Sequence, residues 1–127
     1  MKKIVNHDDA PSPVGPYNQA VEFGDIIFVS GQIAIDQSTG KLMQDSIEAE
    51  TRQVMKNLKL VLSAGGRDFE DVLKVSVFVK DMNMYSRINA VYAEFFNEDT
   101  APARELVEVA NLPKFVNIEI SLIAGKK

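Results

Sequence analysis

Two charged residues lie in segments of this 127-residue chain that otherwise read as buried β-strands. Arg104 lies within residues 102–110, and Glu119 lies within residues 116–123. A guanidinium group can hold the carboxylate of a small substrate through paired hydrogen bonds. A carboxylate can orient a water molecule and accept its proton. If both side chains faced one cleft, they would suit the hydrolysis of a small anionic compound.

Polar and apolar residues alternate along residues 116–123, as in a strand with one buried face. The alternation places Glu119 on the same face as Asn117 and Ser121. The opposite face is apolar and consists of Val116, Ile118, Ile120 and Leu122. A polar face that is simply solvated fits the same pattern, so the alternation alone leaves both interpretations open.

The composition indicates a single globular domain, residues 1–127, with no metal and no cofactor. Hydrophobic residues make up 46% of the chain and charged residues 25%, which is typical of a packed core. The chain has no cysteine, which excludes disulfides and thiolate nucleophiles. Its single histidine, His7, lies in a polar leader, where neither a catalytic triad nor a zinc site is expected.

The charge pattern argues against nucleic acids and membranes as partners. The net charge is −4, and the basic residues are scattered rather than gathered into a stripe. No apolar run approaches the ~20 residues that span a bilayer. The N-terminus also becomes polar too early for a signal-peptide core. We therefore expect a cytoplasmic protein.

Strands are expected over residues 25–34, 72–80, 105–110 and 116–123. Gly31 interrupts the first of them. A glycine inside a strand marks either a β-bulge or a close approach of another group to the backbone, and the sequence leaves both possibilities open.

Two amphipathic helices are expected between these strands. The first is predicted to begin at Asp45, with Glu48 completing a capping box and pairing with Arg52. It is predicted to stop at Gly65-Gly66. The second is predicted over residues 85–96, where apolar side chains recur at helical spacing.

This order of elements favours a mixed sheet with both helices packed on one face. The other face would then face water or a partner. It includes the polar residues around Glu119 but also Val107, Val109 and Ile123. We interpret this face as an oligomer surface.

Several short motifs follow one another from residue 10 to residue 124. They are Val14-Gly15-Pro16-Tyr17, Val29-Ser30-Gly31-Gln32-Ile33, Val77-Phe78-Val79-Lys80-Asp81-Met82, Asn89-Ala90-Val91-Tyr92, Pro102-Ala103-Arg104, Val107-Glu108-Val109-Ala110, Leu112-Pro113-Lys114 and Ile118-Glu119-Ile120. Each motif alone is weak, but the ordered set resembles the RidA (YjgF-type) family over nearly the whole chain.

The resemblance implies a chorismate-mutase-like α+β fold, assembled as a homotrimer with clefts between subunits. It implies hydrolysis of reactive 2-imino and enamino acids, by-products of pyridoxal-phosphate enzymes, to 2-keto acids and ammonia. An imine is already electrophilic, so this reaction requires no metal or cofactor. The family's carboxylate-binding arginine falls on Arg104, and its water-positioning glutamate falls on Glu119. Its other cleft residues fall on Tyr17, Ser30, Gly31 and Asn89.

The chain departs from the family pattern beside Arg104. Glu105 and Leu106 follow the Pro-Ala-Arg motif where Ser-Cys is common, and Ala101 stands where an aromatic residue is frequent. Leu106 is expected to share a strand face with Arg104 and to give the substrate pocket an apolar wall. Glu105 is expected to point the other way.

Two other functions fit parts of the sequence. A regulatory trimer that binds 2-keto acids without turnover would keep Arg104 but would not require Glu119. A ribonuclease or translation inhibitor is a further alternative, because this family has carried that description. The acidic net charge and the terminal position of His7 argue against RNA cleavage.

Overall fold

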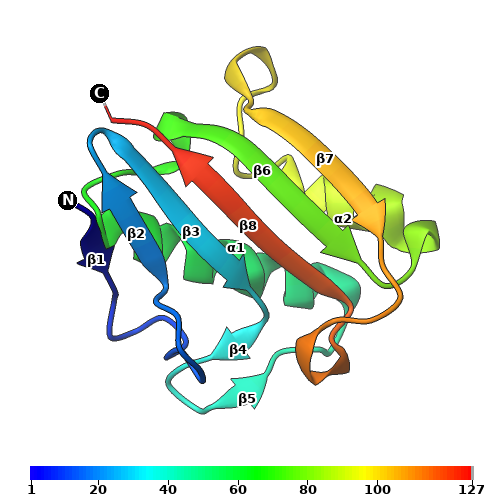
Figure 1. Ribbon diagram of the computed structural model, residues 1–127. Helices are drawn as coiled ribbons and strands as arrows, with labels where there is room; N and C mark the ends of the chain where they lie inside the picture. Colours follow the sequence, from blue (N-terminus) through cyan, green and yellow to red (C-terminus); the bar gives the residue numbers. More distant parts are fainter. Residues whose placement is uncertain (127) are drawn as a thin grey trace.

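The computed structural model describes residues 1–126 and contains a six-stranded mixed β-sheet and a separate two-stranded hairpin (Figure 1). The large sheet has the order β1-β2-β3-β8-β6-β7. Its strands are β1 (Lys3–Val5), β2 (Ala20–Phe23), β3 (Ile26–Gln32), β8 (Ile118–Ala124), β6 (Val72–Val79) and β7 (Ala103–Glu108). The hairpin consists of β4 (Ile35–Asp36) and β5 (Lys41–Leu42).

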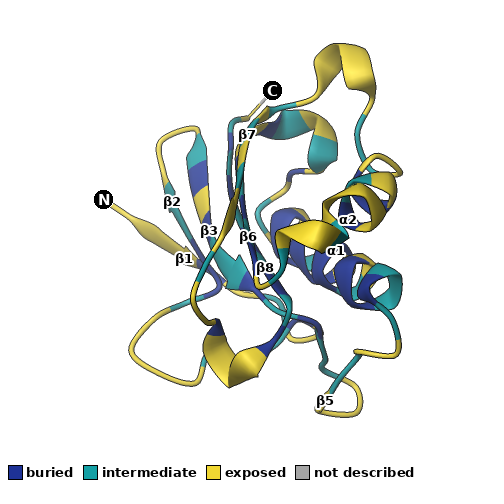
Figure 2. Ribbon diagram, turned by 90° about the vertical axis from the view of Figure 1, so that its right-hand side faces the viewer, coloured by how far each residue is buried: buried dark blue, intermediate teal, exposed yellow. Residues whose placement is uncertain are grey.

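Two helices, α1 (Ile47–Ala64) and α2 (Tyr85–Tyr92), lie on the same side of this sheet (Figure 2). The mixed sheet with two helices on one face is therefore confirmed. We call the side of the sheet that faces the helices the helix face and the other side the open face. Neither helix in the described part of the chain combines the length and the apolar character that a membrane span needs.

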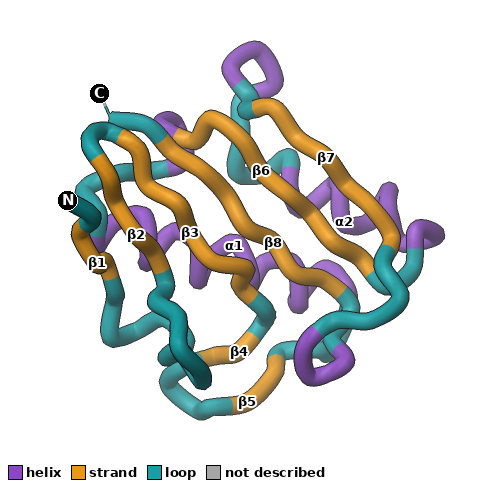
Figure 3. The backbone as a smooth tube through the Cα atoms, viewed as in Figure 1, coloured by secondary structure: helices purple, strands orange, loops and turns teal. Residues whose placement is uncertain are grey.

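Strand pairing places β8 in the middle of the sheet and β7 at its edge (Figure 3). β8 pairs antiparallel with both β3 and β6, whereas β6 and β7 are parallel and α2 lies between them in the chain. The central strand thus carries Glu119 and the edge strand carries Arg104.

The core forms between α1 and the helix face of the sheet. Val75, Val77 and Val79 of β6 are buried, as their alternation predicts. β8 alternates along its whole length, with Ile118 and Ile120 buried and Glu119 half-buried between them. The predicted division of β8 into an apolar and a polar face is confirmed.

The start of α1 differs from the prediction. Ser46, not Asp45, caps the helix, because its extended backbone lets its hydroxyl accept a hydrogen bond from the Ala49 amide at 3.0 Å. The predicted pair between Glu48 and Arg52 is also wrong.

Glu48 and Arg52 form ion pairs instead with residues in and just after α2. Arg87 donates to Glu48 at 2.7 Å, and Arg52 donates to Glu94 at 2.7 Å. The hydrogen bond from Arg87 is the main cause that lowers the pKa of the Glu48 carboxyl to about 2. Helix α2 ends at Tyr92, earlier than predicted, and Phe96 packs edge-on against Phe69.

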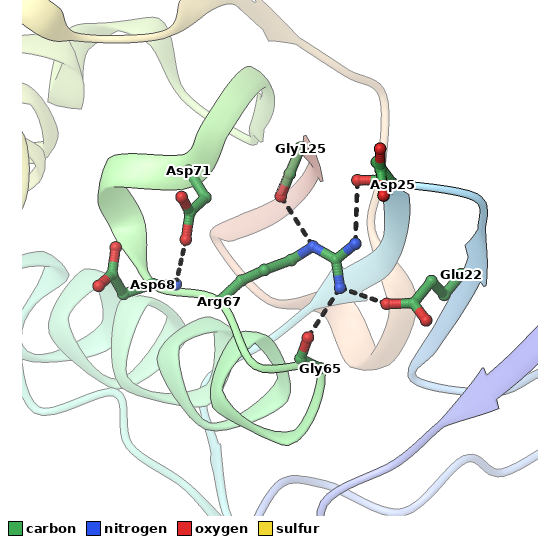
Figure 4. Close-up of polar contacts among 7 residues, drawn as sticks. All are labelled: Glu22, Asp25, Gly65, Arg67, Asp68, Asp71 and Gly125. Atoms are coloured by element: carbon green, nitrogen blue, oxygen red, sulfur yellow. Dashed lines mark hydrogen bonds and ion pairs between the residues drawn. The ribbon is translucent and has the colours of Figure 1, made fainter. Parts of the chain in front are cut away.

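A buried arginine, Arg67, joins β2 and the segments that follow α1 and β8 (Figure 4). Arg67 donates to the carbonyl oxygens of Gly65, Asp25 and Gly125 at 2.7 to 2.9 Å, and it forms an ion pair with Glu22. Each of the three guanidinium nitrogens is thus paired, and four of the five N–H donors are used. This residue has a structural role that the sequence analysis did not predict.

The open face of the sheet has large apolar side chains in solvent. Phe28 of β3 is 50% exposed, and Val107 of β7 is 42% exposed. Phe78 pairs with both Glu119 and Val107 in register, so these side chains share one face. No helix of the described residues covers it (Figure 2).

Candidate functional site

Glu119 is the second residue of β8 and lies on the open face of the sheet. It lines a cavity of about 430 Å³. The walls of this cavity, which we call the glutamate cavity, include Tyr17, Ser30, Gly31, Ile33, Ile35 and Lys114. The carboxyl group is half-buried, and this burial raises its pKa above the ordinary value. A carboxylate with a raised pKa suits proton transfer near neutral pH.

Gly31 makes room for this carboxyl group. The pairing of β3 with β8 shifts register between Val29 and Gln32, so a β-bulge surrounds the glycine. A Cβ atom at Gly31 would lie 2.7 Å from Cδ of Glu119 and closer still to one carboxyl oxygen. The predicted bulge is therefore present, and the group that approaches the backbone is Glu119. A close approach of the Gly31 backbone to a ligand stays a prediction.

Ser30 and Tyr17 form the adjoining wall. The Ser30 hydroxyl donates to the Asn18 carbonyl at 2.7 Å, which ties the turn that carries Tyr17 to strand β3. Tyr17 is 48% exposed and lines the cavity. Ser30 thus positions the wall and keeps its oxygen lone pairs as acceptors.

Arg104 lies in a second cavity of about 650 Å³, the arginine cavity, lined also by Asn89, Tyr92 and Ala101. Its guanidinium group donates to Asn89 Oδ1 at 2.9 Å and to the Tyr85 hydroxyl at 3.0 Å. It also lies 4.7 Å from the centre of the Tyr92 ring. Guanidinium has five N–H donors, so donors remain for a carboxylate.

The spacing of these partners explains how α2 holds the arginine. Tyr85, Asn89 and Tyr92 are four and three residues apart and thus occupy one helix face. Of these three residues, only Asn89 was predicted from the sequence as part of the site, although the helical spacing of the two tyrosines is a signal that could have identified them. Burial raises the pKa of Tyr92 to about 12, so its hydroxyl stays protonated.

Within one chain, Arg104 and Glu119 do not meet. Arg104 pairs in register with Val75, whose side chain is buried on the helix face. Glu119 pairs with Phe78 and faces the open side. The two side chains therefore lie on opposite faces of the sheet, in separate cavities.

The two residues after Arg104 lie on opposite sides, as predicted. Leu106 shares the helix face with Arg104, but it packs against the hydrophobic core and lines neither cavity. The expected apolar pocket wall is therefore not formed by Leu106 in a single chain. Glu105 lies on the open face, pairs with Lys74 at 3.2 Å and accepts a hydrogen bond from Ser76.

Among residues 1–126, no group of three or more histidine, aspartate or glutamate side chains is arranged to hold a metal ion. His7 accepts a hydrogen bond from the Asp9 amide at 3.0 Å and lines neither cavity.

We expect Gly31→Ala to displace the Glu119 carboxyl group while preserving the fold. The new methyl group collides only with the end of a flexible side chain, so the side chain turns away. Turnover should fall by about tenfold or more, as expected when a proton-transfer group is lost. The Glu119→Gln background is the control: there the glycine substitution should cause little further loss. Equal losses in both backgrounds would show that Gly31 acts independently of Glu119.

These features define a small α+β protein whose sheet carries the glutamate cavity on one face and the arginine cavity on the other. Residues 7–126 match the family described as Endoribonuclease L-PSP, and the chain belongs to this family, which includes the YjgF, RidA and RutC proteins.

Individual relatives cover the whole chain. A RutC family protein of Pyrococcus horikoshii is 48% identical, with 100% of both chains covered. The 2-iminobutanoate/2-iminopropanoate deaminase of Escherichia coli is 43% identical, again with 100% of both chains covered. A solved structure of a Thermotoga maritima protein is 50% identical, with a TM-score of 0.96 and coverage of 100% of this chain and 99% of that one. The similarity confirms the expected chorismate-mutase-like α+β fold.

Proposed function

We propose that this protein hydrolyses reactive 2-imino and enamino acids to 2-keto acids and ammonia, and so clears by-products of pyridoxal-phosphate enzymes in the cytoplasm. The observation that carries the proposal is the half-buried Glu119 carboxyl group, with its raised pKa, held over Gly31 in a cavity. The name of the E. coli relative, 2-iminobutanoate/2-iminopropanoate deaminase, supports the same reaction.

The site requires a second copy of the chain. The substrate carries a carboxylate directly next to the imine carbon, so its cation and its water-positioning group must lie within one small cleft. Arg104 and Glu119 of one chain lie on opposite faces of the sheet and are unsuited to this task. We infer that the glutamate cavity of one copy meets the arginine cavity of the next.

The reaction then follows from the two half-sites. Arg104 holds the substrate carboxylate with the guanidinium donors that Asn89 and Tyr85 leave unused. Glu119 accepts a proton from water as the oxygen adds to the imine carbon. Glu119 returns that proton to the former imine nitrogen, which gives the neutral carbinolamine. It then takes the proton of the new hydroxyl group and delivers it to the amino group, so that the C–N bond breaks, ammonia leaves and the C=O bond of the 2-keto acid forms. Tyr17, Ser30 and Gly31 shape the wall around the reacting carbon.

The assembly that we propose is a homotrimer, in which each copy supplies both half-sites to its neighbours. The exposed Phe28 and Val107 give the open face an apolar surface that a partner would bury. A specific interface of this kind should bury more than ~1,000 Å². Sedimentation or light scattering at micromolar concentration should give three times the chain mass, and a monomeric mass would refute the shared site.

A coupled assay tests the function directly. Threonine dehydratase supplies the enamine from threonine, and release of the 2-keto acid is followed with and without this protein. We expect faster release with the protein present. Binding of the 2-keto acid without faster release would instead favour a regulatory trimer. RNA binding that weakens steeply as salt rises would favour the nucleic-acid alternative.

A further inference from the structure

The guanidinium group of Arg104 is held by partners that carry no charge. Asn89 and Tyr85 of α2 accept its hydrogen bonds at 2.9 and 3.0 Å, and it lies 4.7 Å from the centre of the Tyr92 ring. No ion pair within residues 1–126 includes Arg104. Neutral partners orient the cation and leave its charge for a ligand, whereas a carboxylate partner would compete with the substrate.

The Tyr85 hydroxyl group holds the part of the guanidinium group that Asn89 leaves free. Asn89 accepts from Nη1, and Tyr85 accepts from Nη2. With one of these contacts the planar group can still turn, whereas two contacts fix the direction of its remaining N–H donors. The Tyr85 ring centre lies 5.8 Å from Cζ of Arg104, near the outer limit for attraction between a cation and a ring. The hydrogen bond is therefore the main contact that Tyr85 makes with Arg104.

Strand β7 also holds the turn that carries Tyr85. Glu108, the last residue of the strand that contains Arg104, accepts a hydrogen bond from the Met82 amide at 2.8 Å. A short 3-10 helix, Met82–Met84, leads from this contact directly into α2. The start of α2 and the strand that it faces are thus joined at two points, which fixes Tyr85 relative to Arg104.

Tyr92 lies on the same face of α2 but contacts Arg104 through its ring. Its hydroxyl group is buried and has no hydrogen-bond partner within residues 1–126. The two tyrosines therefore contribute different groups to the same guanidinium: Tyr85 contributes its hydroxyl oxygen, and Tyr92 contributes the face of its ring.

We propose that Tyr85 is a positioning residue for carboxylate binding, whose hydroxyl group orients Arg104 so that the free guanidinium donors face the substrate carboxylate. This inference rests on the proposed function. Tyr85 lines neither cavity and therefore acts through Arg104 rather than on the substrate. Support of this kind improves the affinity of the residue that touches the ligand, and it leaves the proton transfers at Glu119 unaltered.

Removal of one hydroxyl group from each tyrosine gives a matched pair of variants. Tyr85→Phe loses the hydrogen bond to Arg104 and keeps the ring, whereas Tyr92→Phe loses only a hydroxyl group without a partner. Calorimetry measures the Kd of a 2-keto acid, and the coupled assay at low and high rates of imine supply separates KM from kcat.

We expect the Kd and KM of Tyr85→Phe to rise about tenfold, the low end of the effect of one hydrogen bond to a charged group. Its kcat should stay within about twofold of the wild-type value, because the proton transfers are unchanged. Tyr92→Phe should keep Kd, KM and kcat within about twofold. An unchanged Kd in Tyr85→Phe, or an equal rise in Tyr92→Phe, would overturn the positioning role.

A second background tests whether Tyr85 acts through Arg104. Arg104→Lys keeps the charge but lacks the planar fork that two partners orient. In this background, Tyr85→Phe should raise Kd by less than about twofold. A tenfold rise there as well would show that Tyr85 acts independently of Arg104 and would also overturn the proposal. Binding of the 2-keto acid without imine hydrolysis in the wild type would reject the deaminase function alone, because the Kd comparisons test Tyr85 without turnover.

Discussion

Replacing Arg104 by alanine is expected to remove 2-keto-acid binding and imine hydrolysis together. A charge-assisted hydrogen bond contributes ~1.5–3 kcal/mol, so affinity should fall by roughly ten- to a hundredfold. The fold should survive, because Arg104 is only half-buried in an edge strand and its partners Asn89 and Tyr85 can turn to water. Calorimetry with a 2-keto acid and the coupled assay measure both effects on one preparation.

Arg87→Ala is the matched control for this variant. Arg87 belongs to α2, the helix that holds Arg104, but its partner is Glu48 on the outer surface and it lines neither cavity. The Arg87→Ala variant should bind the 2-keto acid and hydrolyse the imine as the wild type does. Wild-type deaminase activity in Arg104→Ala would mean that another cation holds the carboxylate, and Lys114 of the glutamate cavity would be the first residue to test.

Glu119→Gln is expected to separate chemistry from binding. Glutamine has nearly the same shape but cannot carry a proton, a role typically responsible for ~10²–10⁴-fold in rate. Turnover should fall by at least about tenfold. This minimum lies below the usual range because imines hydrolyse readily without a catalyst. Affinity for the 2-keto acid should stay near that of the wild type, since Arg104 is unchanged. Glu94→Gln, on the outer surface beside Arg52, serves as the control.

The pH dependence follows from the raised pKa of Glu119. The carboxylate form accepts the proton, so protein-dependent hydrolysis should be lost as pH falls through a value above the usual range for glutamate. The glutamine variant should lack this step. Stability should respond in the opposite sense: burial favours the protonated form, so this group stabilises the fold less as pH rises through its raised pKa. Unchanged turnover in Glu119→Gln would favour the regulatory alternative.

Local patterns predicted much of the fold. The alternation along β8 correctly placed Glu119 between buried isoleucines, because a strand has a fixed period of two. The helix boundaries were less accurate. Asp45 and Ser46 are both good capping residues, and only the backbone conformation shows that Ser46 accepts the Ala49 hydrogen bond.

The arrangement of the site was not predictable in the same way. Whether Arg104 and Glu119 share a face depends on the register of β7 against β6 and of β6 against β8, and a shift of one residue reverses the face. Long-range contacts could not be predicted either, because local sequence patterns do not show which distant segments meet. Asn57 holds Ile33 and Ile35 from more than 20 residues away, and Arg67 reaches Gly125 across 58 residues.

Complementation between two inactive variants tests the shared site most directly. Arg104→Ala keeps the glutamate cavity, and Glu119→Gln keeps the arginine cavity. Coexpression with two different tags, followed by purification on both, isolates mixed assemblies. In a cyclic trimer one of the three clefts then joins two intact half-sites, so imine hydrolysis should recover to about a third of the wild-type rate. Activity no higher than that of the separate variants would contradict a site built from two copies.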